Sequence, residues 1–91
     1  MDLSVVIPVY NEEAILEEAL VGLFEDLSAH AGDYEVILSM NGCVDQTEAI
    51  AERLAKAEPR LQLHRCPTPD YGQALKEGIE RARGALVICE E

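Results

Sequence analysis

Tyr10 and Glu12 are the first residues placed to do chemistry, because they follow an apolar stretch that ends at Pro8. The ring of Tyr10 offers a face on which a planar ligand could stack, and the Glu12 carboxylate could accept hydrogen bonds. Two structural alternatives stay open: Tyr10 could pack at the rim of a sheet, and Pro8 could simply end a strand. We expect Asn11 to cap a helix whose first turn contains Glu12 and Glu13.

The apolar stretch itself predicts a buried strand. Leu3, Val5, Val6 and Ile7 run with almost no polar interruption, as in strands that are covered on both faces. Pro8 cannot donate to a sheet ladder, so it tends to end a strand or to lie at its rim. Ligands of open α/β sheets bind outside the carboxyl ends of the strands, which is where this pattern puts Tyr10 and Glu12.

The rest of the chain alternates helix and strand patterns. Apolar residues recur at helical spacing over 15–27, 50–55 and 74–82, and buried or half-exposed strands are predicted at 34–39, 60–65 and 85–89. Asp45 or Thr47 is predicted to cap the second helix, which ends before Pro59. The order βαβαβαβ predicts an α/β fold, a Rossmann-like three-layer sandwich with a four-stranded parallel sheet and right-handed connections.

The charge of the chain excludes some partners. Seven Lys and Arg against 18 Asp and Glu give a net charge of −11, which argues against sequence-independent binding of nucleic acid. We interpret most of this charge as a solvated acidic surface. An anionic ligand would need local backbone N–H groups, a metal ion or cations from elsewhere.

Cysteine usage and hydropathy suggest a compartment. Cys43, Cys66 and Cys89 are odd in number and lack C-x-x-C spacing, which favours free thiols in a reducing cytosol over a disulfide framework or a zinc site. We find no leader and no apolar run of about 20 residues, so we expect no membrane segment and a cytoplasmic location. The chain ends at Glu91 directly after a strand, so we expect a piece of something longer, with an exposed sheet edge that favours a homo-oligomer.

Three motifs together resemble the start of a family 2 glycosyltransferase. They are V-V-I-P-V-Y-N-E-E at 5–13, N-G-x-x-D-x-T at 41–47 and G-x-A-x-x-x-G-I at 72–79. The resemblance covers essentially the whole chain and implies the N-terminal half of a GT-A fold, which binds a nucleotide-sugar. The P-V-Y-N-E variant is similar to that of polyprenyl-phosphate sugar transferases.

The resemblance assigns candidate site residues. Pro8, Tyr10 and Glu12 match the family's loop that contacts the base and ribose, and Asn41, Gly42 and Gly72 match the second and third loops. Asp45 and Thr47 match a family Asp and Thr, for which we expect a structural role.

The sequence departs from the family in two of these loops. Met40 and Asn41 stand where relatives have two acidic residues, and Met40 cannot accept a hydrogen bond from a base N–H. Asp70-Tyr71-Gly72 replaces a Gly-Lys-Gly, so a cation for ribose or phosphate is missing, and we interpret Lys76 as a surface residue. Glycine at 72 and 78 would allow close backbone approach.

The family's metal motif leads us to expect Mg²⁺ or Mn²⁺ in the full-length enzyme. Glu91 falls at the first position of the acidic motif that follows the fourth strand, and hard cations prefer such oxygen ligands. A solubilising tail is the alternative for Glu90-Glu91. The family's catalytic base belongs to its second half, so we assign no catalytic residue and expect no turnover from this chain alone.

These observations favour one function over its alternatives. The chain, 1–91, is predicted to be the nucleotide-sugar-binding half of a glycosyltransferase that transfers a sugar from a nucleoside-diphosphate donor to an acceptor hydroxyl or phosphate. A non-catalytic interaction or regulatory module with a degenerate nucleotide site is the alternative. A flavodoxin-like sheet is a third possibility, although the first turn lacks G-x-G-x-x-G.

Overall fold

Four strands and three helices alternate along the chain in a computed structural model that describes residues 1–30, 32–67 and 69–89. Their bounds are β1 Leu3–Val9, α1 Leu16–His30, β2 Tyr34–Asn41, α2 Thr47–Ala57, β3 Leu61–Cys66, α3 Tyr71–Arg81 and β4 Leu86–Cys89.

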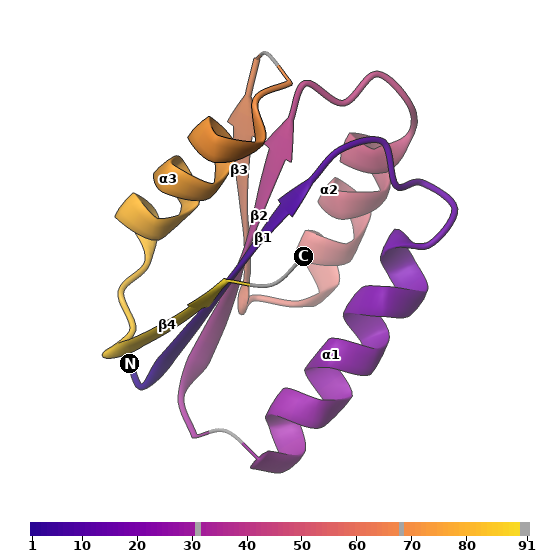
Figure 1. Ribbon diagram of the computed structural model, residues 1–91. Helices are drawn as coiled ribbons and strands as arrows, with labels where there is room; N and C mark the ends of the chain where they lie inside the picture. The colour runs from indigo at the N-terminus through magenta and orange to yellow at the C-terminus, as the bar shows by residue number, and fades with distance from the viewer. Residues whose placement is uncertain (31, 68, 90–91) are drawn as a thin grey trace.

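The strands form one sheet in the order β3-β2-β1-β4, and all three strand pairings are parallel. Helices α1 and α2 cover one face of the sheet and α3 covers the other (Figure 1). The predicted α/β sandwich with a four-stranded parallel sheet is therefore confirmed. The two central strands, β1 and β2, pair over seven residues from Leu3 and Tyr34 to Val9 and Met40.

The core lies around β1 and β2 because helices cover both faces of these strands. All eight residues of β2 are buried, which explains its nearly continuous apolar sequence. Val36, Leu38 and Met40 of β2 belong to the same buried cluster as Leu16 and Leu20 of α1. The edge strand β3 is only partly buried, as its alternating sequence predicts.

The local predictions for the first loop and helix are partly wrong. Helix α1 begins at Leu16 rather than at Glu12, and Ile15 on the predicted apolar stripe is 57% exposed. The stripe is narrower than predicted because only one side of it faces the sheet and α2. Pro8 lies inside β1, beyond Val6, the last residue paired with β4. At Pro8 the strand therefore has a neighbour only on the β2 side among the described residues, which suits a residue without an N–H.

A buried carboxylate links the sheet to the segment between α3 and β4. Glu35 of β2 is 1% exposed and accepts hydrogen bonds from the Ser4 hydroxyl and from the backbone N–H and guanidinium of Arg83. Burial alone would raise the pKa of Glu35, but these hydrogen bonds and the Arg83 charge lower it. The charged form of Glu35 is therefore favoured, and its hydrogen bonds hold Arg83 in a fixed position between α3 and β4.

Among the described residues, no helix is both long enough and apolar enough to cross a membrane.

Substituting Gly78 tests how closely α3 packs on the sheet. A Cβ at this buried position would lie 2.4 Å from Val6 Cγ1, so Gly78→Ala should lower the free energy of unfolding by about 1–3 kcal/mol. Gly22→Ala on α1 is the matched control, because its Cβ would meet nothing within 4 Å and should stabilise by about 0.5–1 kcal/mol. Urea unfolding measures both changes, and a Gly78→Ala variant as stable as the wild type would contradict this packing.

Candidate functional site

The segments that follow β1 and β2 lie side by side at the carboxyl edge of the sheet (Figure 1). Val9 and Met40 are register partners, so the chain leaves both strands at the same level. The Cys43 thiol reaches back from the second segment to the carbonyl of Val9, with 3.6 Å between sulfur and oxygen. We call these two segments, 10–15 and 42–46, the first and second loops.

Asn11 joins the two loops. Its backbone is left-handed, with a φ of 46°, and its Oδ1 accepts hydrogen bonds from the N–H of Val44 at 2.8 Å and of Asp45 at 3.3 Å. Asparagine tolerates this conformation better than most residues. The prediction that Asn11 caps its own helix is therefore wrong: its side chain binds the backbone of the other loop.

Asp45 and Thr47 complete the connection between the loops. The Glu12 N–H donates to Thr47 Oγ1 at 2.8 Å, and the Glu13 N–H donates to Asp45 Oδ2 at 3.3 Å. Asp45 Oδ1 also accepts from the N–H of Thr47, the first residue of α2. Burial opposes ionisation of Asp45, but these hydrogen bonds outweigh it and lower the pKa of the carboxyl. The structural role predicted for Asp45 and Thr47 is confirmed for the loops. The prediction that one of them caps α2 is wrong, because the N-cap residue is Gln46 and it makes no side-chain capping hydrogen bond.

The candidate site residues of the first two loops differ in exposure. Tyr10 is 49% exposed, and Glu12 is half-buried. Pro8 and Asn41 are buried within β1 and β2. Gly42 has a φ of 65°, which explains the Asn-Gly turn signal, and its N–H donates to the carbonyl of Cys66.

The third candidate loop leads into α3. Asp70 caps this helix by accepting a hydrogen bond from the N–H of Gln73, and Gly72 lies exposed in the first turn. The Asp70 carboxylate therefore occupies the helix start, where a phosphate would otherwise find free N–H groups. Glu91, the predicted metal ligand, lies outside the described residues.

Charges at this edge are mostly acidic or already paired. Arg65 of β3 forms ion pairs with Glu48 and Glu52 of α2, with 2.8 Å between its Nε and the Glu48 carboxylate. These ion pairs hold the Arg65 guanidinium over α2, so its charge is already neutralised and does not serve an anionic ligand. This arrangement supports the expectation that an anionic ligand needs a metal ion or cations from elsewhere.

Sequence reasoning missed a second group of chemically active side chains. His64, Cys66 and Glu77 each offer a ligand atom, and these atoms lie within 4.8 Å of one another between β3 and α3. The cysteine spacing alone does not reveal this group, but His64 and Cys66 are two residues apart on a strand and so share a face. That H-x-C spacing was the available signal.

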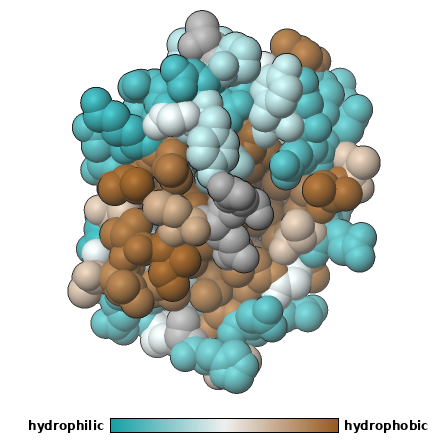
Figure 2. Space-filling view, in the orientation of Figure 1, coloured by the Kyte–Doolittle hydropathy of each residue, from teal (hydrophilic) through white to brown (hydrophobic). Residues whose placement is uncertain are grey.

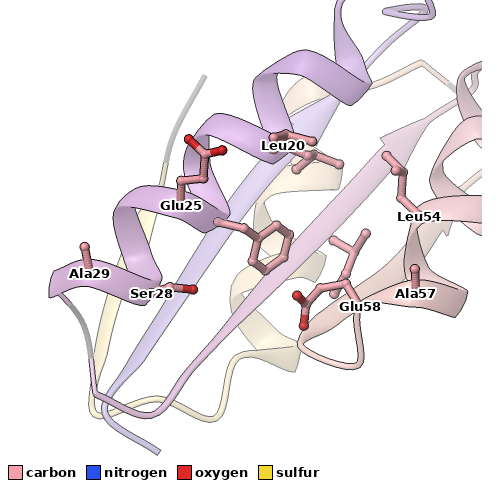
Figure 3. Close-up of a pocket in the computed structure, with 10 residues that line it drawn as sticks. Leu20, Glu25, Ser28, Ala29, Leu54, Ala57 and Glu58 are labelled. Carbon is pink, nitrogen blue, oxygen red and sulfur yellow. The ribbon is translucent and has the colours of Figure 1, made fainter.

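The pocket with the largest volume among those described lies away from these loops. It has about 710 Å³ between α1 and α2, and Figure 3 shows Leu20 and Ser28 of α1 opposite Leu54 and Glu58 near the end of α2. Leu61, the first residue of β3, also lines it, so the pocket opens toward the amino ends of the strands. A smaller pocket of about 190 Å³ between α1 and β1 includes Glu12 of the first loop.

The model of the family described as glycosyl transferase family 2 matches residues 4–89. The chain belongs to this family. The match includes both joined loops and all four strands, so the resemblance inferred from the three motifs is confirmed.

The curated proteins that the chain resembles include named sugar transferases. The chain is 35% identical over 91 residues to the glycosyltransferase AglD of Haloferax volcanii, covering 97% of the chain and 15% of that protein. It is 40% identical over 91 residues to an undecaprenyl-phosphate 4-deoxy-4-formamido-L-arabinose transferase of Pseudomonas aeruginosa, covering 93% of the chain and 26% of the relative. The chain thus spans about a quarter or less of the length of these two family 2 proteins.

A solved structure of Staphylococcus aureus TarS, residues 1–349, has the same fold over this region. The TM-score is 0.79 at 24% sequence identity, and the match covers 99% of the chain and 27% of the solved chain. This likeness shows that the two chains share the fold of the sheet and its three helices.

Removing the Asn11 side chain tests whether it holds the two loops together. Asn11→Ala loses both hydrogen bonds to the second loop and puts alanine at a positive φ, so the free energy of unfolding should fall by about 1–3 kcal/mol. Urea unfolding measures this change, and hydrogen exchange at the Val44 amide should become faster. Asn11→Asp keeps an acceptor oxygen and should stay near the wild type; unchanged Val44 exchange in Asn11→Ala would show that the clamp is not needed.

Proposed function

We propose that the chain is the donor-binding part of a glycosyltransferase that transfers a sugar from a nucleoside-diphosphate sugar to an acceptor hydroxyl or phosphate. Membership of family 2 supports this proposal. The observation that carries it is the pair of joined loops at the carboxyl edge of the sheet, where open α/β sheets bind ligands.

We assign different roles to the candidate residues. Tyr10 is exposed enough to stack on the nucleotide base, and we expect the half-buried Glu12 to accept hydrogen bonds from base or ribose through its carboxylate. Pro8 and Asn41 are buried, so we expect them to shape the floor of the site. Gly42 and Gly72 leave room for backbone approach in the second and third loops.

The diphosphate of the donor is the difficult group for this chain to bind. The net charge is −11, and Asp70 occupies the start of α3. A Mg²⁺ or Mn²⁺ ion would neutralise the diphosphate when bound. The joined loops do not fit such an ion well, because the Asp45 carboxylate already accepts two backbone N–H groups and Glu13 accepts from Gln46. We therefore keep Glu91 as the proposed ligand.

The name of one group of relatives suggests an acceptor class. Since the Pseudomonas aeruginosa relative is an undecaprenyl-phosphate sugar transferase, we propose a polyprenyl phosphate as the acceptor of the full-length family 2 enzyme. We also propose a cytosolic location for the chain, which its three free cysteines support.

An interaction or regulatory module is the second candidate function. Met40 is fully buried among core side chains. A residue that packs in the core therefore stands where relatives have an acidic residue. Together with Asp70 in the third loop, Met40 favours the interpretation that this site no longer binds a nucleotide.

Nucleotide titration distinguishes the two functions. Calorimetry with UDP and GDP, with and without Mn²⁺, should show weak, metal-assisted binding of one nucleotide if the chain is a donor-binding part. Tyr10→Ala should weaken that binding by about 1–3 kcal/mol because it removes the stacking face. Val21→Ala on the exposed surface of α1 is the control and should bind like the wild type.

Absence of heat with every nucleotide would favour the module. Equal affinity of the wild type and Tyr10→Ala would remove Tyr10 from the proposed site while leaving nucleotide binding in place.

We also propose that copies of the chain associate through β4. This edge strand exposes Leu86, Val87 and Ile88, and Figure 2 shows apolar side chains gathered below the hydrophilic top of this face. Light scattering should report a dimer or larger species that Val87→Lys shifts toward the monomer. A wild-type chain that stays monomeric at high concentration would contradict the association.

A further inference from the structure

Three metal-ligating side chains of different chemical types meet between β3 and α3. His64 and Cys66 face α3 from β3, and Glu77 faces them from the helix. Glu77 Oε1 lies 2.5 Å from His64 Nε2 and 3.3 Å from Cys66 Sγ, and the sulfur lies 3.7 Å from the same imidazole nitrogen. All three donor atoms therefore point at one small volume.

We propose that His64, Cys66 and Glu77 form a zinc site. In a tetrahedral zinc site with Zn–S near 2.3 Å and Zn–N or Zn–O near 2.0–2.1 Å, donor atoms lie about 3.3–3.6 Å apart. Both distances from the Cys66 sulfur are already close to this range. Only the His64–Glu77 pair has to open, by about 0.8 Å, which a small rotation of the long Glu77 side chain can supply.

The donor set selects the metal. A thiolate with an imidazole and one carboxylate suits zinc, whereas Mg²⁺ and Mn²⁺ prefer sites made of oxygen ligands. The zinc site is therefore distinct from the ion proposed for the donor diphosphate. Three protein ligands leave the fourth position of a tetrahedral ion for water or another ligand.

The surroundings of the cluster hold the ligands in place. Gln73 donates to the second carboxylate oxygen of Glu77, which is the kind of outer contact that orients ligands in metal sites. Cys66 is fixed by the sheet, since its carbonyl accepts from Gly42 and its register partner is Asn41. The ion could enter from the solvent side, where the His64 and Glu77 side chains are 12% and 26% exposed.

The competing arrangement is a hydrogen-bonded cluster without metal. Glu77 accepts hydrogen bonds from Gln73, His64 and Cys66, and these contacts lower the pKa of its carboxyl to about 2. Burial and the adjacent Glu77 charge raise the pKa of the Cys66 thiol, so a metal must displace its proton. The Arg81 guanidinium donates to the Glu77 carbonyl, and its positive charge would repel a bound cation.

Zinc binding would have a structural consequence. Cys66 is the last residue of β3, and Glu77 lies in α3, so one ion would tie the two ends of the segment that connects them. That segment includes the third candidate loop and leads to Gly72. The zinc site itself does not depend on the proposed function.

Metal titration of the chain tests the proposal. After removal of metals by a chelator, the wild type should bind one equivalent of Zn²⁺, and its melting temperature should rise. Co²⁺ in the same site should give a thiolate-to-cobalt charge-transfer band that Cys66→Ser abolishes. Cys43→Ser is the matched control, because this half-buried cysteine lies outside the cluster, and it should keep both the band and the zinc affinity.

Two further variants keep the test decisive if Cys66→Ser fails to fold. Glu77→Gln removes a zinc ligand and should weaken zinc binding. Gln73→Ala removes the hydrogen bond that orients Glu77, and this loss should weaken zinc binding by about 10–100-fold. Equal zinc affinity in the wild type and Glu77→Gln, or no bound zinc in the wild type, would overturn the proposal. Nucleotide calorimetry tests the donor-binding proposal separately, so a negative zinc titration does not bear on that proposal.

Discussion

The parallel pairing of β1 with β2 is the interaction on which the rest of the structure depends. The two strands pair over seven residues, and helices cover both faces of this pair. Because the strands are parallel, their carboxyl ends fall at one edge of the sheet, and the register makes Val9 and Met40 end at the same level. A shift by one residue would turn the apolar side chains of β2 to the wrong faces and would separate Asn11 from its partners in the second loop.

The loops at this edge are held by hydrogen bonds between distant parts of the chain. Asn11, Asp45 and Thr47 satisfy backbone N–H groups across the gap between the loops, so neither loop has to be ordered by a ligand. Tyr10 stays exposed on this fixed base. These joined loops are the rigid surface on which we propose that base and ribose bind, and under the same proposal the diphosphate depends on a metal ion.

Most of the architecture could be predicted from the sequence because it follows from periodicity. The apolar run of β1, the buried β2 and the alternating β3 each have a pattern that a parallel sheet explains. Gly78 was expected to allow close backbone approach in the third loop, whereas in the structure it lets α3 pack closely on Val6 of the sheet. The family match then confirmed what the three motifs resembled.

Features that depend on contacts between distant residues could not be predicted in this way. Asn11 follows a local capping rule in the sequence, yet its side chain binds residues 33 and 34 positions later. Glu35 would not be expected in a buried strand without knowledge of Ser4 and Arg83. The His64, Cys66 and Glu77 cluster likewise requires knowing that α3 lies over β3.

The central claim is that the loops after β1 and β2 form one nucleotide-binding surface at the carboxyl edge. Mapping backbone amide chemical shifts by NMR while UDP or GDP is added with the diamagnetic ion Mg²⁺ tests it most directly. The account predicts that the largest changes gather at residues 10–13, 42–46 and 70–73. Changes confined to the α1–α2 pocket, or no changes at these loops, would contradict it.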